Sequence, residues 1–324
     1  MNLPSHHSSR PSRFLAPLAV AFAAVAAIGC MLTQASAQLL VEMKLNKNLY
    51  VAYEPIIAEI TVSNRAGRDI VLGGPAGASW LNFDVASDQG EPILPSGATP
   101  VAGSTVLGAG KSHTLTVSLG KYYALGKPRN YRVKASVYFA GTGQYIGARP
   151  QLFGVTEARL IWQQVVGIPR GKPEAGNYRH YSLLIFRDTE RTLLYVRVRD
   201  QKSKRVLATY SLGRLIEVRD PQATIDGENR LHVLFLGAPR TYSHKVINYG
   251  GETLLSDVYK DEPGSGSPQL MLSSSGKVQV AGGSVNDPTL AAEAAAHAAS
   301  QEGGGTDRPR NLSDRPEGLP FVGE

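Results

Sequence analysis

Cysteine is almost missing from this sequence, which has a single one, Cys30, among its 324 residues. That residue lies in an alanine-rich apolar segment near the N-terminus. Once this segment is removed, the remaining chain has no thiol, which excludes a disulfide framework, a thiol enzyme and a cysteine-ligated metal site. Stability must then come from buried apolar side chains, and the chain is long enough for two domains of ordinary size.

Acidic residues are missing from residues 1–37, where two arginines precede an apolar run over residues 14–32. Small side chains follow at Ala35 and Ala37, which are the two positions that a signal peptidase reads. We therefore predict a signal peptide that is cleaved between Ala37 and Gln38. The mature protein is then periplasmic or secreted, with no stable membrane insertion.

The single cysteine leaves an alternative open. The sequence Ala27-Ile28-Gly29-Cys30 resembles a lipoprotein processing box, although leucine is usual where Ala27 stands. In that case Cys30 carries a lipid and the protein is an outer-membrane lipoprotein. A retained membrane anchor is a third alternative, but Pro17 interrupts the apolar run.

The charge is unevenly distributed along the chain. The formal net charge is +7, with the positive excess over residues 38–283 and a negative excess over residues 284–324. A basic body with an acidic tail favours polyanionic partners, such as envelope glycans or nucleic acid. An ordinary solvated surface explains the same modest excess.

Helical periodicity is also missing before residue 161, and a two-residue alternation takes its place. Apolar side chains share one face over residues 39–45 and again over residues 56–62. Further short strands are predicted between turns rich in Gly, Pro, Asp and Ser: Ile70–Leu72, Leu81–Val85, Thr114–Leu119 and Tyr131–Phe139. Many short strands with regular turns indicate an all-β sandwich.

The opening of this region carries a series of spaced residues: Tyr50-x-x-x-Glu54-Pro55-Ile56, then Val62-x-Asn64-x-x-Gly67, then Ile70-x-Leu72. Residues 127–133, Lys-Pro-Arg-Asn-Tyr-Arg-Val, fit a penultimate strand, with Asn130 where glycine is usual. These residues resemble the strands of bacterial immunoglobulin-like domains, most closely the proteinase-inhibitor-like and macroglobulin-like modules. The resemblance covers residues 39–158 and implies an immunoglobulin-like sandwich, a scaffold that hosts many unrelated functions.

The second half of the chain contains a repeat with an offset of 47 residues, since the pattern that begins at Pro221 recurs without a gap at Pro268. Each copy is predicted to form a strand, a tight turn and a second strand, and a looser copy spans residues 183–198. Such hairpins resemble β-propeller blades, but a closed ring needs about four blades. We therefore predict an open β-meander of blade-like hairpins.

These observations divide the chain into four segments: a signal peptide over 1–37, an immunoglobulin-like β-sandwich over 38–160, a blade-like repeat module over 161–283, and a tail over 284–324. The tail is alanine-rich over residues 287–300, where a short helix is predicted. Beyond residue 303 it is rich in Gly, Pro and charge, which is typical of disorder.

Motifs for metal or cofactor binding are missing. Five histidines follow the signal peptide, and none has the short spacing of a metal site: His113, His180, His232, His244 and His297. His232 and His244 lie on consecutive predicted strands and could meet across a hairpin, but the sequence favours two histidines that are satisfied by backbone or water. Trp80 and Trp162 are predicted to be core or interdomain contacts rather than ligand platforms. We predict no metal and no cofactor.

One surface feature is a candidate binding site, the hairpin over residues 193–205. Its strand alternates an apolar face with a second face that carries one aromatic and two basic residues, and the following turn adds three more cations: Tyr195, Arg197, Arg199, Lys202, Lys204 and Arg205. Interleaved aromatic and basic groups suit phosphate or sulfate groups and stacked rings. A solvent-facing strand protected from edge pairing by its charges is the simpler explanation.

The sequence thus predicts an exported, non-enzymatic binding or interaction protein of the cell envelope, whose partner is an unknown envelope protein or glycan. The first alternative is a polyanion binder that acts through the basic hairpin. The second is a hydrolase of envelope polymers, whose paired carboxylates need only be adjacent in space.

Overall fold

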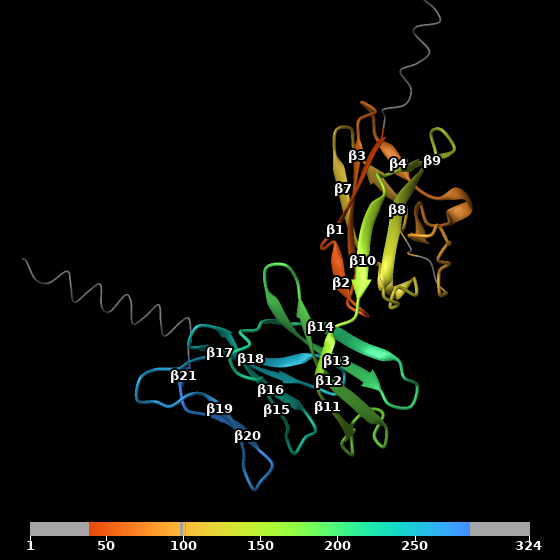
Figure 1. Ribbon diagram of the computed structural model, residues 1–324. Coiled ribbons are helices and arrows are strands. Elements are labelled where there is room, and N and C mark those ends of the chain that lie inside the picture. The colour runs from red at the N-terminus through yellow and green to blue at the C-terminus, as the bar shows by residue number, and fades with distance from the viewer. Residues whose placement is uncertain (1–38, 98–99, 101, 286–324) are drawn as a thin grey trace, which may run out of the picture. The chain divides into compact units, whose positions relative to one another are not determined.

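The computed structural model describes residues 39–97, 100 and 102–285 (Figure 1), and the chain divides into two compact units between Glu157 and Ala158. The described residues form strands and two short 3₁₀ helices, which confirms the prediction of an all-β protein. None of the described helices is long and apolar enough to cross a membrane. The predicted signal peptide, the alanine-rich helix and the tail beyond Val285 lie outside the described residues, whereas the first two residues of the predicted tail, Ser284 and Val285, form a short strand.

The first unit is built from two facing sheets and a small ribbon. One sheet has the order β1-β3-β7 and is antiparallel: β1 (Leu39–Leu45), β3 (Ile57–Asn64) and β7 (Ser112–Ser118). The other has the order β2-β10-β8-β5: β2 (Leu49–Val51), β10 (Gln151–Thr156), β8 (Arg129–Phe139) and β5 (Leu81–Ser87). Strand β9 (Gln144–Gly147) pairs with β8, and β4 (Ile70–Leu72) pairs with β6 (Thr105–Leu107).

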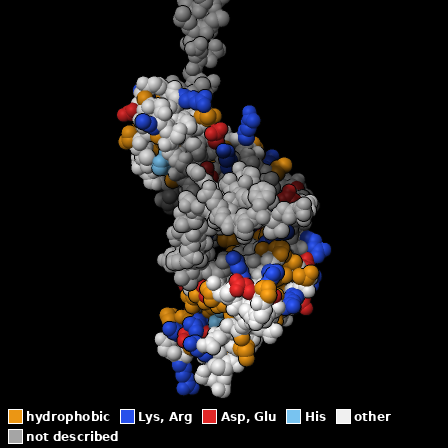
Figure 2. Space-filling model, turned by 90° about the vertical axis from the view of Figure 1, so that its left-hand side faces the viewer, with side chains coloured by type: hydrophobic (Ala, Val, Ile, Leu, Met, Phe, Trp, Pro, Cys, Tyr) orange, Lys and Arg blue, Asp and Glu red, His pale blue; other side chains and the backbone are white. Residues whose placement is uncertain are grey.

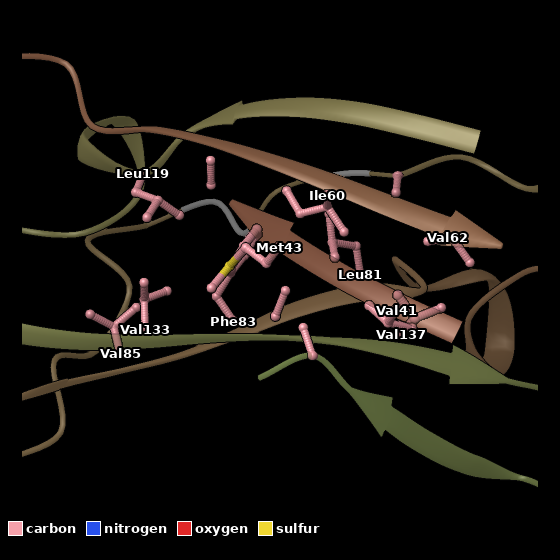
Figure 3. Close-up of a cluster of buried hydrophobic side chains, with 14 of the residues drawn as sticks. Val41, Met43, Ile60, Val62, Leu81, Phe83, Val85, Leu119, Val133 and Val137 are labelled. Atoms are coloured by element: carbon pink, nitrogen blue, oxygen red, sulfur yellow. The ribbon is translucent and has the colours of Figure 1, made fainter. Parts of the chain in front are cut away.

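The core of the first unit lies between these sheets, as the alternation predicts. Val41 and Met43 of β1 are buried, and the side chains on either side of Met43 are exposed. Figure 3 shows these two residues pointing toward the side chains of the opposite sheet, among them Phe83 and Val133. Trp80 is also buried in this core, where its indole N–H donates to the carbonyl of Gly103 at 2.7 Å.

The second unit contains two large sheets and a separate two-stranded one, and in each the strands follow their order in the chain, so the unit is an open β-meander as predicted. The first sheet consists of β11 (Arg159–Gly167), β12 (Tyr178–Arg187), β13 (Thr192–Asp200) and β14 (Val206–Arg214). The second consists of β15 (Gln222–Ile225), β16 (Leu231–Ala238), β17 (Thr241–Ile247), β18 (Thr253–Lys260) and β21 (Ser284–Val285). Buried side chains of both sheets form one core, to which Trp162 packs as a half-buried neighbour.

Both copies of the sequence repeat fold as hairpins. The first copy is β15–β16, and the second is β19 (Gln269–Leu272) paired with β20 (Val278–Ala281). Asn229 and Gly276 occupy equivalent turn positions, and both have a positive φ, 59° and 77°. Asparagine and glycine are the residues that adopt this left-handed backbone most readily. The two copies therefore form the same turn although different residues occupy this position.

The second hairpin packs on the outer face of the sheet that contains the first. Its Leu270 and Val280 contact a small buried cluster of Leu234, Leu236 and Tyr242. The backbone N–H of Leu270 donates to the side-chain oxygen of Gln222 at 2.8 Å, and the N–H of Gly227 donates to the carbonyl of Gly276 at 2.8 Å. The two repeats therefore stack on each other, and this covers the outer face of β16.

Candidate functional site

The turn between β13 and β14 is held by one carboxylate. Oδ1 of Asp200 accepts hydrogen bonds from the backbone N–H and the hydroxyl of Ser203, at 2.6 and 2.7 Å. These hydrogen bonds to Ser203 lower the pKa of Asp200 below its usual value. Lys204 has a φ of 60°, and the N–H of Asp200 donates to the carbonyl of Arg205 at 2.9 Å. The turn is thus fixed in a conformation that presents basic side chains.

Only part of the predicted binding surface lies at the molecular surface. Lys202, Lys204 and Arg205 are exposed, whereas Arg199 is half-buried. Tyr195 is 1% exposed, so the expectation that it offers a ring for stacking is wrong. The reason is tertiary: β13 is an interior strand, and the Tyr195 ring meets Phe186 edge-on, with ring centroids 6.2 Å apart. Alternation identified one buried face of β13 correctly but could not reveal that the other face is also covered at this point.

Arg197 also lies deeper than the alternation predicts. It is half-buried, and its Nε donates to the hydroxyl of Thr209 on β14 at 3.3 Å. This arginine is therefore engaged in the sheet, and the exposed cations of the predicted group come from the turn.

Arg199 takes part in a hydrogen-bonded chain on one face of the first sheet. Its Nη2 lies 2.7 Å from Nδ1 of His180, and Nε2 of His180 lies 3.1 Å from the side-chain oxygen of Gln163. A guanidinium only donates, so Nδ1 must be the acceptor and His180 must be neutral with its proton on Nε2. Burial lowers the pKa of His180, and the positive charges of Arg199 and Lys204 lower it further.

The nearby acids are already engaged with another cation. Asp200 Oδ2 lies 2.5 Å from Nη1 of the buried Arg179, and Glu174 pairs with Nη2 of the same side chain. In the described part of the chain, none of Arg199, Lys202, Lys204 and Arg205 forms an ion pair, and the Nε of Arg199 is buried without a hydrogen-bond partner. We define these four residues as the basic cluster.

Elsewhere the surface charge is mixed. Figure 2 shows Lys and Arg side chains interspersed with Asp and Glu over the described surface in view. A positive field that attracts anions must therefore be local, arising where cations lack acidic neighbours.

A second group of titratable residues lies on the outer face of β16 and β17. His232 and His244 do meet across the hairpin, and their rings are stacked with Nδ1 of His232 3.1 Å from Nε2 of His244. Nε2 of His232 lies 3.0 Å from Oδ2 of Asp226, which also accepts from Nε of Arg230 at 2.6 Å. Both histidines and Asp226 are buried, and the histidines bond to each other and to Asp226, so the favoured expectation of histidines satisfied by backbone or water is wrong for His232.

The hydrogen bonds of this chain fix its protonation. Asp226 accepts, so His232 donates from Nε2, and its Nδ1 then accepts the proton of His244 Nε2. Nδ1 of His244 is left buried and has no partner among the described residues. Burial lowers the pKa of His244 to about 4, and His232 adds to this effect. Burial also lowers the pKa of His232, an effect larger than the opposing one of Asp226.

The remaining predicted residues are dispersed. His113 belongs to the first unit, where it lies beside Trp80 with ring centroids 6.2 Å apart. The other described histidines belong to the second unit. The structure brings no three or more His, Cys, Asp or Glu side chains together in a metal-binding arrangement within its described residues. Cys30, Ala37, Gln38 and His297 lie outside the described residues.

No protein-family model matches this chain, and no curated protein matches it. Among solved structures, the chain is similar to the crystal structure of Spo0M, a sporulation control protein from Bacillus subtilis, at 12% sequence identity. That similarity covers 54% of this chain and 91% of Spo0M, with a TM-score of 0.27.

Proposed function

We propose that this chain is an exported, non-enzymatic binding protein of the cell envelope that recognises an anionic glycan through the basic cluster. The observation that carries the proposal is a group of four cations, Arg199, Lys202, Lys204 and Arg205, without an ion pair in the described part of the chain. Burial is the largest cause of the lowered pKa of His180, and the further lowering by Arg199 and Lys204 is a second sign of the local positive field. Sulfate, phosphate or carboxylate groups supply the missing counter-charge.

The arrangement of the cluster suits a polymer rather than a single small anion. Three of the cations lie on an exposed turn, where flexible side chains can follow successive charged groups. Arg199 is different, since its hydrogen bond to His180 orients the guanidinium. The oriented guanidinium of Arg199 gives the polymer a defined attachment point. The three turn cations add an electrostatic attraction that tolerates variation in the spacing of the charged groups of the polymer.

Export is part of the proposal and rests on the N-terminal sequence. The arginines, the apolar run and the small residues at Ala35 and Ala37 favour cleavage before Gln38 and a periplasmic or secreted location. Lipidation at Cys30 and attachment to the outer membrane is the alternative. Either location places the basic cluster in the same compartment as envelope glycans.

We also propose that the first unit is an immunoglobulin-like module and the second a pair of blade-like sheets. The strand orders β1-β3-β7 and β2-β10-β8-β5 support the first assignment, because they match the two sheets of that sandwich. Tyr131 supports it too: it lies near the start of β8, and its hydroxyl donates to the carbonyl of Lys127 at 2.8 Å, as in a tyrosine corner. The four-stranded meander of β11 to β14 supports the second.

The test is heparin affinity with a matched control. Replacing Lys202, Lys204 and Arg205 together by Gln removes three charges and keeps a polar side chain at each position. We expect the variant to elute from heparin at a clearly lower salt concentration, because each lost contact reduces counterion release. The control replaces three exposed cations of the first unit, Arg65, Arg68 and Lys111, in the same way, and it should elute close to the parent protein.

Two results would contradict the proposal. Equal losses in both triple variants would mean that only net charge matters, and no retention at moderate salt would mean that there is no site. Competition by single-stranded DNA as strong as that by heparin would identify a nucleic-acid binder instead. The substituted residues are exposed, so the thermal stability of both variants should stay close to that of the parent protein.

A further inference from the structure

The first unit contains a groove that the basic cluster does not involve. The groove has a volume of about 530 Å³, which falls in the range of ligand pockets. It crosses strands β8 and β10 near the end of their sheet, and it is lined in part by Asn130, Arg132, Leu152 and Gly154. The side chains at the alternate positions, Tyr131 and Phe153 among them, are buried in the core, so this groove lies on the outward face of the sheet.

Besides the buried Ser87 and Tyr131, whose hydroxyls are already hydrogen-bonded, four polar side chains line the groove: Asn48, Asp88, Asn130 and Arg132. All four are exposed, and none of them makes a side-chain hydrogen bond or an ion pair within the described residues. Two amides, one carboxylate and one guanidinium therefore present unused donors and acceptors to whatever enters.

The backbone that holds these side chains is well fixed. The N–H of Gly154 donates to the carbonyl of Asn48 at 2.8 Å, and the N–H of Asp88 donates to the carbonyl of Asn130 at 3.0 Å. The turn that carries Asp88 is closed by a hydrogen bond from Gly90 N–H to Ser87 O at 3.0 Å, with a φ of 83° at Gly90. Side chains on such a frame bind with a smaller loss of conformational entropy.

A glycine forms part of the floor. Gly154 lies within strand β10, where glycine is a poor strand former and often marks close approach of a ligand. A Cβ at this position would lie 3.0 Å from Leu49 Cδ1 and 3.2 Å from Asn130 Oδ1, so any larger residue intrudes on the groove. Beside it, Leu152 is 72% exposed and offers an apolar surface among the polar groups.

We propose that this groove binds a neutral saccharide unit. Among the described residues that line it, Asp88 and Arg132 are the charged ones and their charges cancel, so the site favours a ligand without net charge. Vicinal hydroxyls both donate and accept, which matches paired amides, a carboxylate and a guanidinium. The C–H face of a sugar ring packs against Leu152 and over Gly154. The site lies in the first unit and does not depend on the anion site of the second.

The experiment is titration of the full chain, observed by NMR, with a panel of neutral disaccharides: cellobiose, maltose, lactose and N,N′-diacetylchitobiose. We expect at least one of them to bind and to shift the amide signals of Leu152 and Gly154. Asn130→Ala should weaken that binding about tenfold, which corresponds to the loss of one well-placed hydrogen bond. Asn82→Ala is the matched control, because Asn82 is an exposed amide on the outward face of the same sheet, outside the groove, and it should bind like the parent.

Three results would overturn the proposal. They are no binding by any disaccharide of the panel, binding that Asn130→Ala leaves unchanged, and shifts at Leu152 and Gly154 with glycylglycine or glucuronic acid alone. The last result would assign the groove to a charged ligand. Asn48→Ala provides a second test should Asn130→Ala fail to fold, since the Asn48 side chain also lines the groove without an intramolecular hydrogen bond.

Discussion

The two hairpins of the 47-residue repeat have the same backbone in different environments. In β16 of the first copy, the six residues from Leu231 to Leu236 are all buried, whereas in β20 of the second copy only Val278 is. The first turn carries the buried Asp226, and the second carries the exposed Ser273 at the equivalent position. The repeated pattern thus specifies a hairpin, and the place of each copy in the unit decides how much each residue contributes to stability.

The turn residues should show the largest difference. Asp226 accepts hydrogen bonds from the backbone N–H groups of Glu228 and Arg230, from the Arg230 side chain and from His232. Asp226→Ala leaves these donors without an acceptor, and we expect it to destabilise the chain by about 3–5 kcal/mol. Ser273→Ala removes the two exposed hydrogen bonds of its hydroxyl, with the Lys277 N–H and with the Ser275 hydroxyl, and should cost about 1 kcal/mol or less. Equal values in urea unfolding would show that the turns are energetically equivalent.

The first hairpin contacts a titratable partner that the second lacks, because His232 bonds to His244 of β17 and Gln279 stands at the position equivalent to His232. Burial lowers the folded-state pKa of His244 to about 4. Its neutral form therefore stabilises the fold fully above about pH 6.5, the unfolded-state pKa, and this contribution is lost as the pH falls toward 4. We expect up to about 3 kcal/mol to be lost over this interval, measured by urea unfolding at several pH values.

His244→Phe should flatten this slope, because phenylalanine has a similar ring that cannot take up a proton. Gln279→Ala, in the exposed position of the second hairpin, is the control and should leave the slope unchanged. A slope that persists in His244→Phe would place the acid sensitivity at other groups.

The strand interiors should show the smallest difference. Val233 is fully buried between the two large sheets of the second unit. The equivalent Val280 is half-buried, and it packs against the outer face of the sheet that contains β16. Val233→Ala should destabilise the chain by about 2–3 kcal/mol through lost burial and the resulting cavity, and Val280→Ala by about 1 kcal/mol. A larger loss for Val280→Ala would mean that the second hairpin is the more tightly packed, contrary to the burial pattern.

The sequence alone determined the strands, because the buried face of each strand appears as a local alternation of apolar and polar residues. Val41, Met43, Ile60 and Val62 lie in the core as their spacing predicts, and the repeat predicted two hairpins from thirteen aligned positions each. Turn chemistry is equally local, which is why Asn229 and Gly276 were found in left-handed turns. The histidine pair was only an open alternative, because consecutive strands bring His232 and His244 near each other but do not show that their rings meet.

Only the tertiary structure decided which strand faces are covered and which distant residues meet. Tyr195 has the alternation of a solvated face, yet it is buried, because burial on an interior strand depends on neighbours far away in the sequence. The groove has the same origin: Asn48, Asp88, Asn130 and Gly154 are separated by dozens of residues and have no shared motif. Sheet register and packing bring them together, and both are set by non-local contacts that local periodicity does not record.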